Sequence, residues 1–269
     1  FFILGFADDL KINVPAKFRL LIMVASLIFL IIYNEFFIER ISLEYLDNLM
    51  EIDIFSLFFV CLCFLFIING SNLIDGFNGL LGLHALIIFS VLFFVNLIYE
   101  NDIKYLLLYL SLITLIFLLF NFPKAQIFLG DSGAYLVGTL IAISSIKTNN
   151  VEGDETISSF FFCILLSYLF FEVFFSFFRK IFITRTSPLL PDSKHLHMLL
   201  YQLLLKKNKN KLKSNYKVSI YINSIYLCFL IPAILFMGNG LFCRYYFFSL
   251  LIIYIYLYKI LYNQNNQSE

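Results

Sequence analysis

Four aspartates stand at polar interruptions of an otherwise apolar chain. Asp8 and Asp9 are adjacent, while Asp75 and Asp131 lie in two separate glycine-containing stretches. Carboxylates placed at one site repel one another unless a cation or a positively charged ligand is bound. Oxygen ligands favour Mg²⁺ or Mn²⁺ over zinc, and Mg²⁺ leaves several of its positions to water and substrate phosphates. These residue types therefore predict a Mg²⁺ site, with Mn²⁺ as the alternative metal.

The longest interruption is the stretch 69–80, with the sequence Asn-Gly-Ser-Asn-Leu-Ile-Asp-Gly-Phe-Asn-Gly-Leu. The centre of a simple membrane-spanning helix does not tolerate so many polar residues and glycines. Its amides and carboxylate offer oxygen ligands, and glycine lets the backbone approach a ligand closely. Taken alone, the stretch could equally be a flexible connection between two helices.

A second candidate site is the segment Gly130-Asp131-Ser132-Gly133, which opens a predicted helix. The free N–H groups at the start of a helix hold anions such as phosphate. A carboxylate there would oppose a phosphate unless a metal bridged them, so we predict Asp131 as a direct metal ligand. The alternatives are an N-cap role for Asp131 and a solvent-exposed helix terminus for Asp8 and Asp9.

Two histidines follow in the segment His195-Leu196-His197, directly after Lys194. Zinc would need a third histidine or cysteine nearby, and the remaining histidine, His84, lies in an apolar run and is interpreted as a packing residue. Histidine and lysine beside a turn suit contacts to a diphosphate or a nucleotide. The run of lysines between 206 and 213, taken alone, is better explained as an interfacial segment that binds anionic lipids.

The elements that must position these residues are membrane helices. Hydrophobic residues make up 61% of the chain, charged residues 14%, and the mean hydropathy is +0.88. Such values exclude a soluble domain and predict an all-α, polytopic integral membrane protein. We expect one membrane domain over 1–269, with about eight complete transmembrane helices and, at Phe1–Phe6, the end of one that is truncated. The expected spans are 15–33, 54–68, 80–98, 105–122, 134–146, 157–178, 218–237 and 241–261, and the expected loops of the functional face are 7–14, 69–79, 123–132 and 179–217.

Counting crossings places all four of these loops on the same face of the membrane, because two spans separate each from the next. Of the 19 lysines and arginines, fifteen fall on that face and four on the other. By the positive-inside rule, the face with the candidate residues is predicted to be cytoplasmic.

The chain resembles the polyprenyl-phosphate N-acetylhexosamine-1-phosphate transferases, the family of the MraY enzyme of lipid I synthesis and the WecA-type initiators of O-antigen and related glycans. The matching motifs, in the family's order and spacing, are Ala7-Asp8-Asp9, the stretch 69–80, Ile127-Phe-Leu-Gly-Asp131-Ser-Gly and His195-Leu-His197. The resemblance implies transfer of a sugar 1-phosphate from a UDP-N-acetylhexosamine to undecaprenyl phosphate, with release of UMP and with Mg²⁺. It further implies the bacterial inner membrane, an active site that faces the cytoplasm, and two or three helices upstream of Phe1.

On this resemblance the site residues have expected roles. Asp8, Asp9 and Asp75 are expected to be catalytic: Asp8 to position or deprotonate the lipid acceptor, Asp9 to support it, and Asp75 to help place the metal. Asp131 and Asn72 are expected to bind the metal. The residues expected to bind the substrates are Asn69, Asn78, Lys124, Lys194, His195 and His197. The lipid bilayer is the expected environment, a homodimer is compatible with the sequence, and no nucleic-acid partner is expected.

Three positions depart from the family's pattern. Asn78 stands where the motif usually has a second carboxylate, Met198 follows the histidine pair where another histidine is frequent, and Glu172 replaces an aspartate ahead of Arg179 and Lys180. The short histidine segment points to the WecA-like branch and to UDP-GlcNAc or a relative as donor. The alternatives are a transporter that uses its carboxylates for cation coupling, a structural subunit, and a catalytically weakened paralogue.

Overall fold

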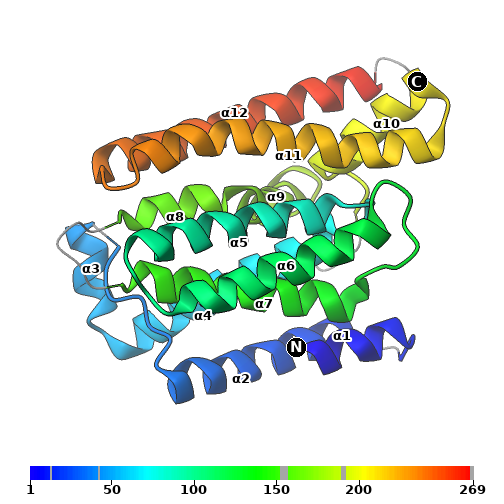
Figure 1. Cartoon of the computed structure of the whole chain (residues 1–269). Coiled ribbons are helices and arrows are strands. Elements are labelled where there is room, and N and C mark those ends of the chain that lie inside the picture. The colour runs from blue at the N-terminus through cyan, green and yellow to red at the C-terminus, as the bar shows by residue number, and fades with distance from the viewer. Residues whose placement is uncertain (13, 42, 152–156, 189–191, 267–269) are drawn as a thin grey trace.

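The computed structural model describes residues 1–12, 14–41, 43–151, 157–188 and 192–266, and within these ranges it contains helices and connecting segments but no strand (Figure 1). The all-α prediction is confirmed. The α-helices are α1 (Phe2–Asp9), α2 (Ala16–Asn34), α3 (Glu44–Met50), α4 (Asp53–Ile74), α5 (Leu80–Ile98), α6 (Ile103–Asn121), α7 (Gly130–Asn149), α8 (Ser159–Leu165), α9 (Ser167–Phe178), α10 (Leu196–Asn208), α11 (Lys211–Leu235) and α12 (Gly240–Asn266), and a π-helical turn, η1 (Arg179–Ile183), continues α9.

Among the described residues, six helices are long and apolar enough to cross a membrane: α2, α4, α5, α6, α11 and α12. Counted as one bent span, α8 together with α9 and η1 adds a seventh candidate, whose two parts are bent by 73° relative to each other. The helix α7 has 20 residues, long enough to cross about 30 Å of hydrocarbon, but it carries serines, threonines and glycines and is largely buried among the other helices. Counting α7 gives the approximate number of spans that the sequence predicts.

Three glycines allow the helices around the candidate residues to approach closely. A Cβ at Gly138 of α7 would lie 2.8 Å from the Cα of Ile68 in α4, and one at Gly70 of α4 would lie 2.6 Å from the carbonyl oxygen of Leu169 in α9. A Cβ at Gly5 of α1 would lie 2.3 Å from the backbone nitrogen of Ser132 in α7. Small residues are the usual means of bringing membrane helices together, since lipid supplies no hydrophobic driving force between them. They let α1, α4, α7 and α9 meet at one end of the bundle.

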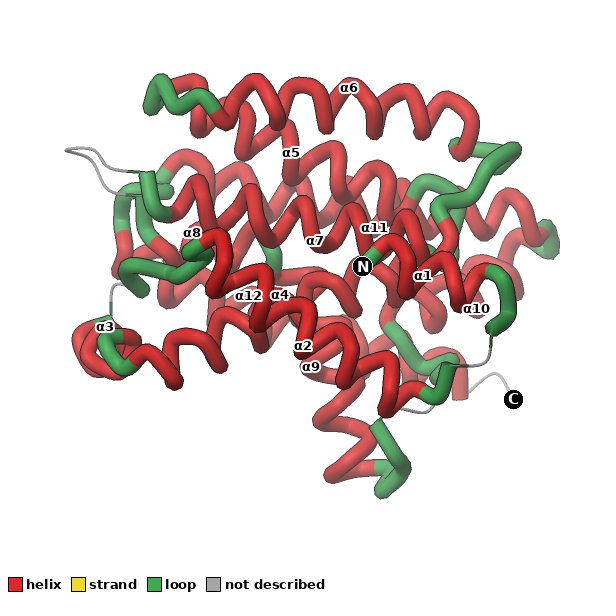
Figure 2. Tube along the Cα trace, turned by 90° about the horizontal axis from the view of Figure 1, so that it is seen from below, coloured by secondary structure: helices red, strands yellow, loops and turns green. Residues whose placement is uncertain are grey.

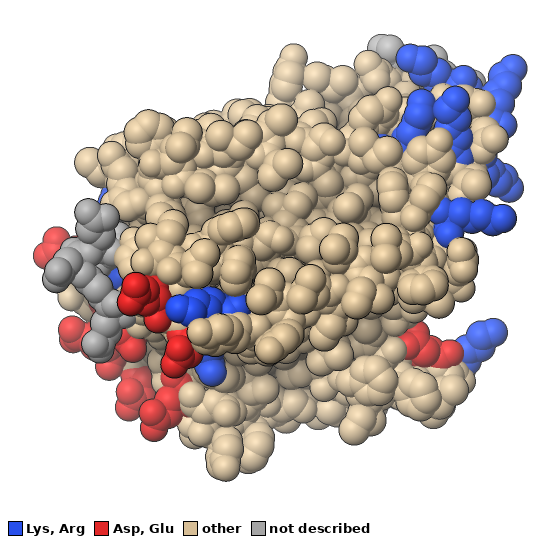
Figure 3. Space-filling model, viewed as in Figure 1, with Lys and Arg blue, Asp and Glu red and all other residues tan. Residues whose placement is uncertain are grey.

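The two ends of the bundle differ in charge. Figure 3 shows lysines and arginines gathered at the end where α10 and α11 meet, with a few acidic residues on the same side, and acidic residues together with some basic ones at the opposite end near α3, while most of the surface between them carries no charge in this view. Asp9, Asp75 and Asp131 stand at the ends of α1, α4 and α7 that face the same way as α10 (Figure 1). An apolar girdle between two polar ends is the pattern of a protein that spans a bilayer.

The boundaries of the four predicted loops differ from the structure, because helices continue into them. Residues 69–74 form the last turns of α4, where the Nδ2 of Asn69 donates to the carbonyl oxygen of Leu65 at 2.8 Å. Because a polar side chain can hydrogen-bond to the backbone of its own helix, it need not be left unpaired, and the helix continues where the sequence predicts a break. The range 7–14 begins inside α1, the range 123–132 ends inside α7, and 179–217 contains η1, α10 and the start of α11. Residue 13 and residues 189–191 of these ranges lie outside the described part of the chain.

The bent span also reaches the surface. Figure 2 shows α9 leading away from the rest of the bundle. Its continuation η1 exposes large apolar side chains, with Phe182 63% and Ile183 71% exposed. Apolar side chains in this position suit contact with lipid.

Candidate active site

The start of α7 is held by a carboxylate from another helix. The Oδ1 of Asp9 accepts a hydrogen bond from the backbone N–H of Asp131 at 2.9 Å. Its Oδ2 accepts from the backbone N–H of Ser132 at 3.1 Å and from the hydroxyl of Ser132 at 2.7 Å. Gly130 makes this approach feasible, because its φ is +65° and a Cβ there would lie 2.8 Å from the carboxylate oxygens of Asp9. Asp9 thus caps the first free N–H groups of α7 and neutralises the positive end of that helix.

This cap perturbs the ionisation of Asp9. Burial acts to raise the pKa of Asp9, but the hydrogen bonds from the Ser132 hydroxyl and from the backbone of Asp131 and Ser132 outweigh it and hold the pKa below its ordinary value. Hydrogen bonds donated to a carboxylate favour its charged form. The start of α7 was expected to hold a phosphate, but two of its backbone N–H groups, those of Asp131 and Ser132, already bond to the carboxylate of Asp9.

Asp131 contacts the 69–80 motif directly. The Nδ2 of Asn72, in the last turns of α4, donates to the Oδ1 of Asp131 at 2.7 Å, so two residues 59 positions apart share one hydrogen bond. The close α4–α7 contact at Gly138 positions this pair. Among the described residues, no hydrogen bond is found to the Oδ2 of Asp131 or to the Oδ1 of Asn72. These two oxygens are the ligands that Asp131 and Asn72 could offer a metal ion.

Asp75 follows α4 directly and completes the acidic cluster. Burial, followed by the negative charges of Asp131 and Asp9, raises the pKa of Asp75 to about 7. A divalent cation beside these carboxylates would relieve that repulsion. Within the described residues, no group of three or more histidine, cysteine, aspartate or glutamate side chains is arranged to hold a metal alone. The oxygen ligands present fit Mg²⁺, which takes one or two carboxylates and completes its shell with water and substrate phosphates.

Asp8 and Asp9 have different surroundings although they are adjacent. The Oδ2 of Asp8 accepts a hydrogen bond from the guanidinium of Arg19 at 2.5 Å, which links α1 to the start of α2. Asp8 is half-buried and Asp9 is exposed. The structure therefore separates the two residues into an arginine-paired carboxylate and a helix cap.

The loop between α4 and α5 is fixed by hydrogen bonds at Asn78. Its backbone N–H donates to the Oδ1 of Asn215 at 2.9 Å, its carbonyl oxygen accepts from the hydroxyl of Ser219 at 2.7 Å, and its Nδ2 donates to the carbonyl oxygen of Pro123 at 3.0 Å. Asn121 adds a contact, accepting from the backbone N–H of Gly79 at 2.6 Å. The side chain at the position where a second carboxylate is usual is thus a donor that joins this loop to the segment after α6.

The histidine pair lies beside this loop. The ring of His197 meets the ring of Phe77 edge-on, with centroids 5.7 Å apart, and the rings of His195 and His197 are parallel with centroids 5.4 Å apart. Both histidines contact Glu172 of α9: its Oε2 lies 3.0 Å from the Nδ1 of His195, and its Oε1 lies 3.3 Å from the Nδ1 of His197. The motif loop and the histidine segment are therefore neighbours in space.

The other predicted substrate-binding residues are placed less closely. Asn69 bonds within α4, as described above, and Lys124 is exposed after α6. The ammonium of Lys194 lies 5.8 Å from the centroid of the Tyr262 ring in α12, which holds the lysine against the bundle while leaving its surface exposed. The structure brings Asn72, Asp75 and Asp131 together with Asp9, and places the histidines beyond Phe77.

Several contributors were not predicted from the sequence as site residues. Ser132 and Arg19 hold Asp9 and Asp8, and Arg179 forms an ion pair with Asp192 ahead of the histidine segment. Burial acts to raise the pKa of Asp192, but its hydrogen bonds from Arg179 and from the backbone of Lys194 lower it overall. In the sequence, Glu172 stands out only as a departure from the family's pattern. The signal that could have identified it is the presence of a carboxylate within an apolar span, where an unpaired charge is costly.

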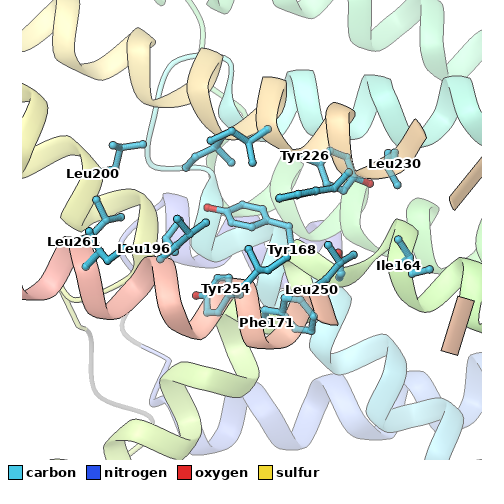
Figure 4. A pocket seen from close by; sticks show the side chains of 17 residues that line it. Ile164, Tyr168, Phe171, Leu196, Leu200, Tyr226, Leu230, Leu250, Tyr254 and Leu261 are labelled. Carbon is cyan, nitrogen blue, oxygen red and sulfur yellow. The ribbon is translucent and has the colours of Figure 1, made fainter. Parts of the chain in front are cut away.

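An apolar cavity of about 200 Å³ lies behind the histidine segment, between α8 and α9, α10, α11 and α12 (Figure 4). Leu196, which separates the two histidines, lines it together with Tyr168, Tyr226 and Tyr254. The acidic residues of the site do not line this cavity. The His84 ring lies against Tyr226, with centroids 4.2 Å apart, and its Nδ1 is 3.2 Å from the Oδ1 of Asn223, which agrees with a buried packing role.

The fold and the site together define a class: a polytopic helical membrane protein whose acidic and amide side chains meet at one end of the bundle, next to a buried histidine pair. Comparison with known proteins narrows this class. Residues 1–149 match glycosyl transferase family 4, and the chain belongs to this family. The matched range contains Asp8, Asp9, the 69–80 motif and Asp131.

Three relatives illustrate the similarity. The undecaprenyl-phosphate alpha-N-acetylglucosaminyl 1-phosphate transferase of Thermotoga maritima is 31% identical over 196 residues, which cover 73% of this chain and 57% of the relative. A probable undecaprenyl-phosphate N-acetylglucosaminyl 1-phosphate transferase of Bacillus subtilis is 30% identical over 200 residues, covering 72% and 54%. The phospho-N-acetylmuramoyl-pentapeptide-transferase of Dictyoglomus thermophilum is 35% identical over 199 residues, covering 70% and 62%. The matches thus span a little over half of each relative's length.

Proposed function

We propose that this protein transfers an N-acetylhexosamine 1-phosphate from a UDP-sugar to undecaprenyl phosphate and releases UMP. The observation that carries the proposal is the contact between Asn72 and Asp131, because it joins two separate motifs into one acidic site next to Asp75. The named activities of the relatives support the lipid acceptor and the sugar 1-phosphate as the transferred group. Such a reaction begins the membrane stage of a cell-envelope glycan.

The metal of the proposed reaction is Mg²⁺, with Mn²⁺ as a substitute. Asp131 and Asn72 would hold it through the oxygens that have no partner among the described residues, and Asp75 would lie close to it. When bound, the ion would neutralise the charge on the diphosphate of the donor. Two oxygen ligands and a neighbouring carboxylate leave positions for that diphosphate, which agrees with the preference of Mg²⁺ for mixed shells of protein, water and phosphate.

The reacting groups of the proposal are two phosphates. An oxygen of the acceptor phosphate forms a bond to the phosphorus that carries the sugar, and the bond from that phosphorus to the bridging oxygen breaks, so that UMP leaves with the electron pair. A phosphate monoester has a second pKa of about 6 and is already mostly dianionic at neutral pH. The protein therefore needs to position and neutralise the acceptor more than to deprotonate it.

The protein's own residues divide this work. Asp8, held by Arg19, stands at the end of α1 and is our candidate for positioning the acceptor. Asp9 supports the site by holding the start of α7. His195, His197 and Lys194 would contact the phosphates from the other side of Phe77.

The donor is proposed to be UDP-GlcNAc or a close relative. The names of the Thermotoga and Bacillus relatives support this sugar, while the Dictyoglomus relative acts on a different one. The concentration of basic residues at the end that carries the site supports a cytoplasmic orientation of that end (Figure 3). This orientation matches the cellular location of nucleotide sugars.

The test is a transfer assay with the full-length protein in membranes. Undecaprenyl phosphate is supplied with UDP-GlcNAc, UDP-GalNAc or UDP-MurNAc-pentapeptide, and both UMP and the lipid-linked product are quantified. We expect equal amounts of UMP and lipid-linked GlcNAc 1-phosphate, and none of either without the acceptor lipid. Correctly folded protein that releases no UMP from any donor would contradict the proposal and favour the transporter or structural alternatives.

A further inference from the structure

Glu172 occupies an unusual position for a carboxylate. It lies in α9, about two turns before the end of that helix, and is 1% exposed. Each of its oxygens faces a different imidazole nitrogen: Oε2 is 3.0 Å from the Nδ1 of His195 and Oε1 is 3.3 Å from the Nδ1 of His197. One side chain of α9 thus engages both histidines of a segment more than twenty residues further along the chain.

Burial at this depth has to be compensated. A charged side chain within a membrane helix costs several kcal/mol unless it is paired, and such residues usually mark a functional site. The Glu172 carboxylate is surrounded by the two histidines and by the hydroxyls of Tyr168 and Tyr254, and of these groups only the histidines can carry a positive charge. Because imidazolium is the charged form of histidine, an ionised Glu172 favours a proton on its partners.

The geometry fixes which nitrogen of each ring faces the carboxylate. An ionised carboxylate only accepts hydrogen bonds, so the Nδ1 of each histidine must carry a proton to bond to it. The Nε2 of each ring then points away from Glu172, and the two rings are parallel to within 7°. The Nε2 of His197 is buried and has no hydrogen-bond partner in the described part of the chain. A buried polar atom without a partner is a natural position for a ligand atom.

We propose that Glu172 is the positioning residue of this site: it holds His195 and His197 with Nδ1 protonated, so that their Nε2 atoms are presented together to phosphate oxygens. The inference rests on the proposed function, since the phosphates are those of the donor or acceptor. Phosphate oxygens accept hydrogen bonds, and an imidazolium retained by Glu172 has an Nε2–H to donate. A neutral imidazole with Nδ1–H would present only a lone pair.

Aromatic neighbours hold His197 of this pair close to the acidic site. Phe77 belongs to the loop that follows Asp75, and its ring meets that of His197 edge-on. Tyr168, one turn before Glu172 on α9, places its hydroxyl 3.5 Å from the Nδ1 of His197. Glu172 and these two aromatic rings therefore fix His197 next to the acidic site, which is where the diphosphate would lie.

Nitrogen NMR tests the assignment directly, because residues 1–269 contain only three histidines, so few of the signals come from this part of the protein. The full-length protein, labelled with ¹⁵N-histidine in detergent micelles, should show the Nδ1 of His195 and His197 in the protonated range. Addition of inorganic pyrophosphate should shift their Nε2 signals and leave those of His84 in place. A deprotonated Nδ1 in either histidine of the wild-type protein, or Nε2 atoms that stay deprotonated when pyrophosphate is bound, would overturn the proposal.

Substitution of Glu172 distinguishes positioning from simple structural pairing. Glu172→Gln keeps the size of the side chain but offers one oxygen and one NH₂ group, so only one histidine can retain its Nδ1–H bond to it. We expect one Nδ1 signal to move to the deprotonated range and the affinity for pyrophosphate to fall roughly tenfold or more, the size of effect seen when the hydrogen-bond partner of a metal-bound histidine is removed. Glu172→Asp retains two acceptor oxygens on a shorter side chain and should keep both protons with an intermediate affinity.

The control is Glu100→Gln, which makes the same chemical change at an exposed residue of the opposite face. It should change neither the Nδ1 signals of the two histidines nor the affinity for pyrophosphate. Unchanged pyrophosphate affinity in folded Glu172→Gln would refute the positioning role. If Glu172→Gln does not fold, the positioning role is tested by the Nδ1 signals of the wild-type protein and by the pyrophosphate affinity of Glu172→Asp. Neither reading requires turnover, so a protein that shows the predicted Nδ1 protons and binds pyrophosphate but releases no UMP would contradict the proposed function and leave the role of Glu172 intact.

Discussion

Replacing Asp9 by alanine should destabilise the protein, because Asp9 is the cap of α7. The substitution removes three hydrogen bonds, two to backbone N–H groups and one to the Ser132 hydroxyl. It also removes a negative charge from the positive end of a 20-residue helix. Loss of an N-cap costs about 0.5–2 kcal/mol, and loss of a favourable dipole contact costs about 0.3–1 kcal/mol. Water can reach the exposed Asp9 position and replace part of the lost hydrogen bonding, so the expected loss of stability is roughly 1–2 kcal/mol.

The assay is reversible unfolding in mixed micelles, followed by circular dichroism as the fraction of denaturing detergent is increased. Asp102→Ala is the matched control, because Asp102 stands before α6 on the opposite face and makes no capping hydrogen bond with its side chain. We expect the unfolding midpoint to shift for Asp9→Ala and to remain near wild type for Asp102→Ala. Asp9→Asn, which keeps one acceptor oxygen but no charge, should fall between wild type and alanine.

The pH dependence of this difference follows from the lowered pKa of Asp9. A carboxyl group whose pKa is lower in the folded state stabilises the protein above its unfolded value, near 4, and this contribution is lost as the pH falls through the folded value. The stability difference between wild type and Asp9→Ala should therefore be constant near neutral pH and shrink below about pH 4. Asp9→Ala that unfolds like wild type yet has no transfer activity would refute the capping role and indicate direct contact of Asp9 with substrate.

Two further substitutions test how the site is held. Asn78→Asp restores the carboxylate that is usual in the family, but it replaces the donor to the Pro123 carbonyl oxygen with an acceptor. We therefore expect no gain in activity and a loss of about 1 kcal/mol of stability in the unfolding assay. A gain in UMP release at unchanged stability would contradict this expectation. Gly138→Ala should cost about 1–3 kcal/mol and weaken transfer by separating Asn72 from Asp131, since its Cβ would lie 2.8 Å from the Cα of Ile68. Gly76→Ala, where nothing lies within 4 Å of the new Cβ, is the stability control, and equal stability of the two alanine variants would show that α4 and α7 can move apart freely.

The sequence predicts the fold class and the gathering of the acidic residues well, because both depend on patterns along the chain. Hydropathy identifies the membrane helices, and the number of crossings between motifs places Asp8, Asp75 and Asp131 at one end of the bundle. The structure agrees with this placement and adds the contact between Asn72 and Asp131. Helix boundaries were less predictable, since Asn69 continues α4 by bonding to the carbonyl oxygen of its own preceding turn.

What the sequence could not supply is the partner of each polar side chain. Asp8 and Asp9 are identical in type and adjacent, yet one pairs with Arg19 and the other caps α7. Asn78 reads as a missing carboxylate until its contact with Pro123 is known. Glu172 is only a departure from the family's aspartate until its two oxygens are found to face two histidines. These roles depend on which helices pack together, and one-dimensional spacing does not determine that packing.

The central claim is tested most directly by Mg²⁺-dependent UMP release in wild type and Asp131→Asn, measured side by side in the full-length protein with undecaprenyl phosphate and UDP-GlcNAc. Asparagine preserves the shape of Asp131 and one oxygen but removes the charge that would hold the metal. We predict that wild type releases UMP only when Mg²⁺ or Mn²⁺ is present, and that Asp131→Asn, folded as judged by the unfolding assay, releases none above background at any Mg²⁺ concentration. Near-normal turnover by Asp131→Asn would contradict the assignment of the metal site to Asp131 and Asn72.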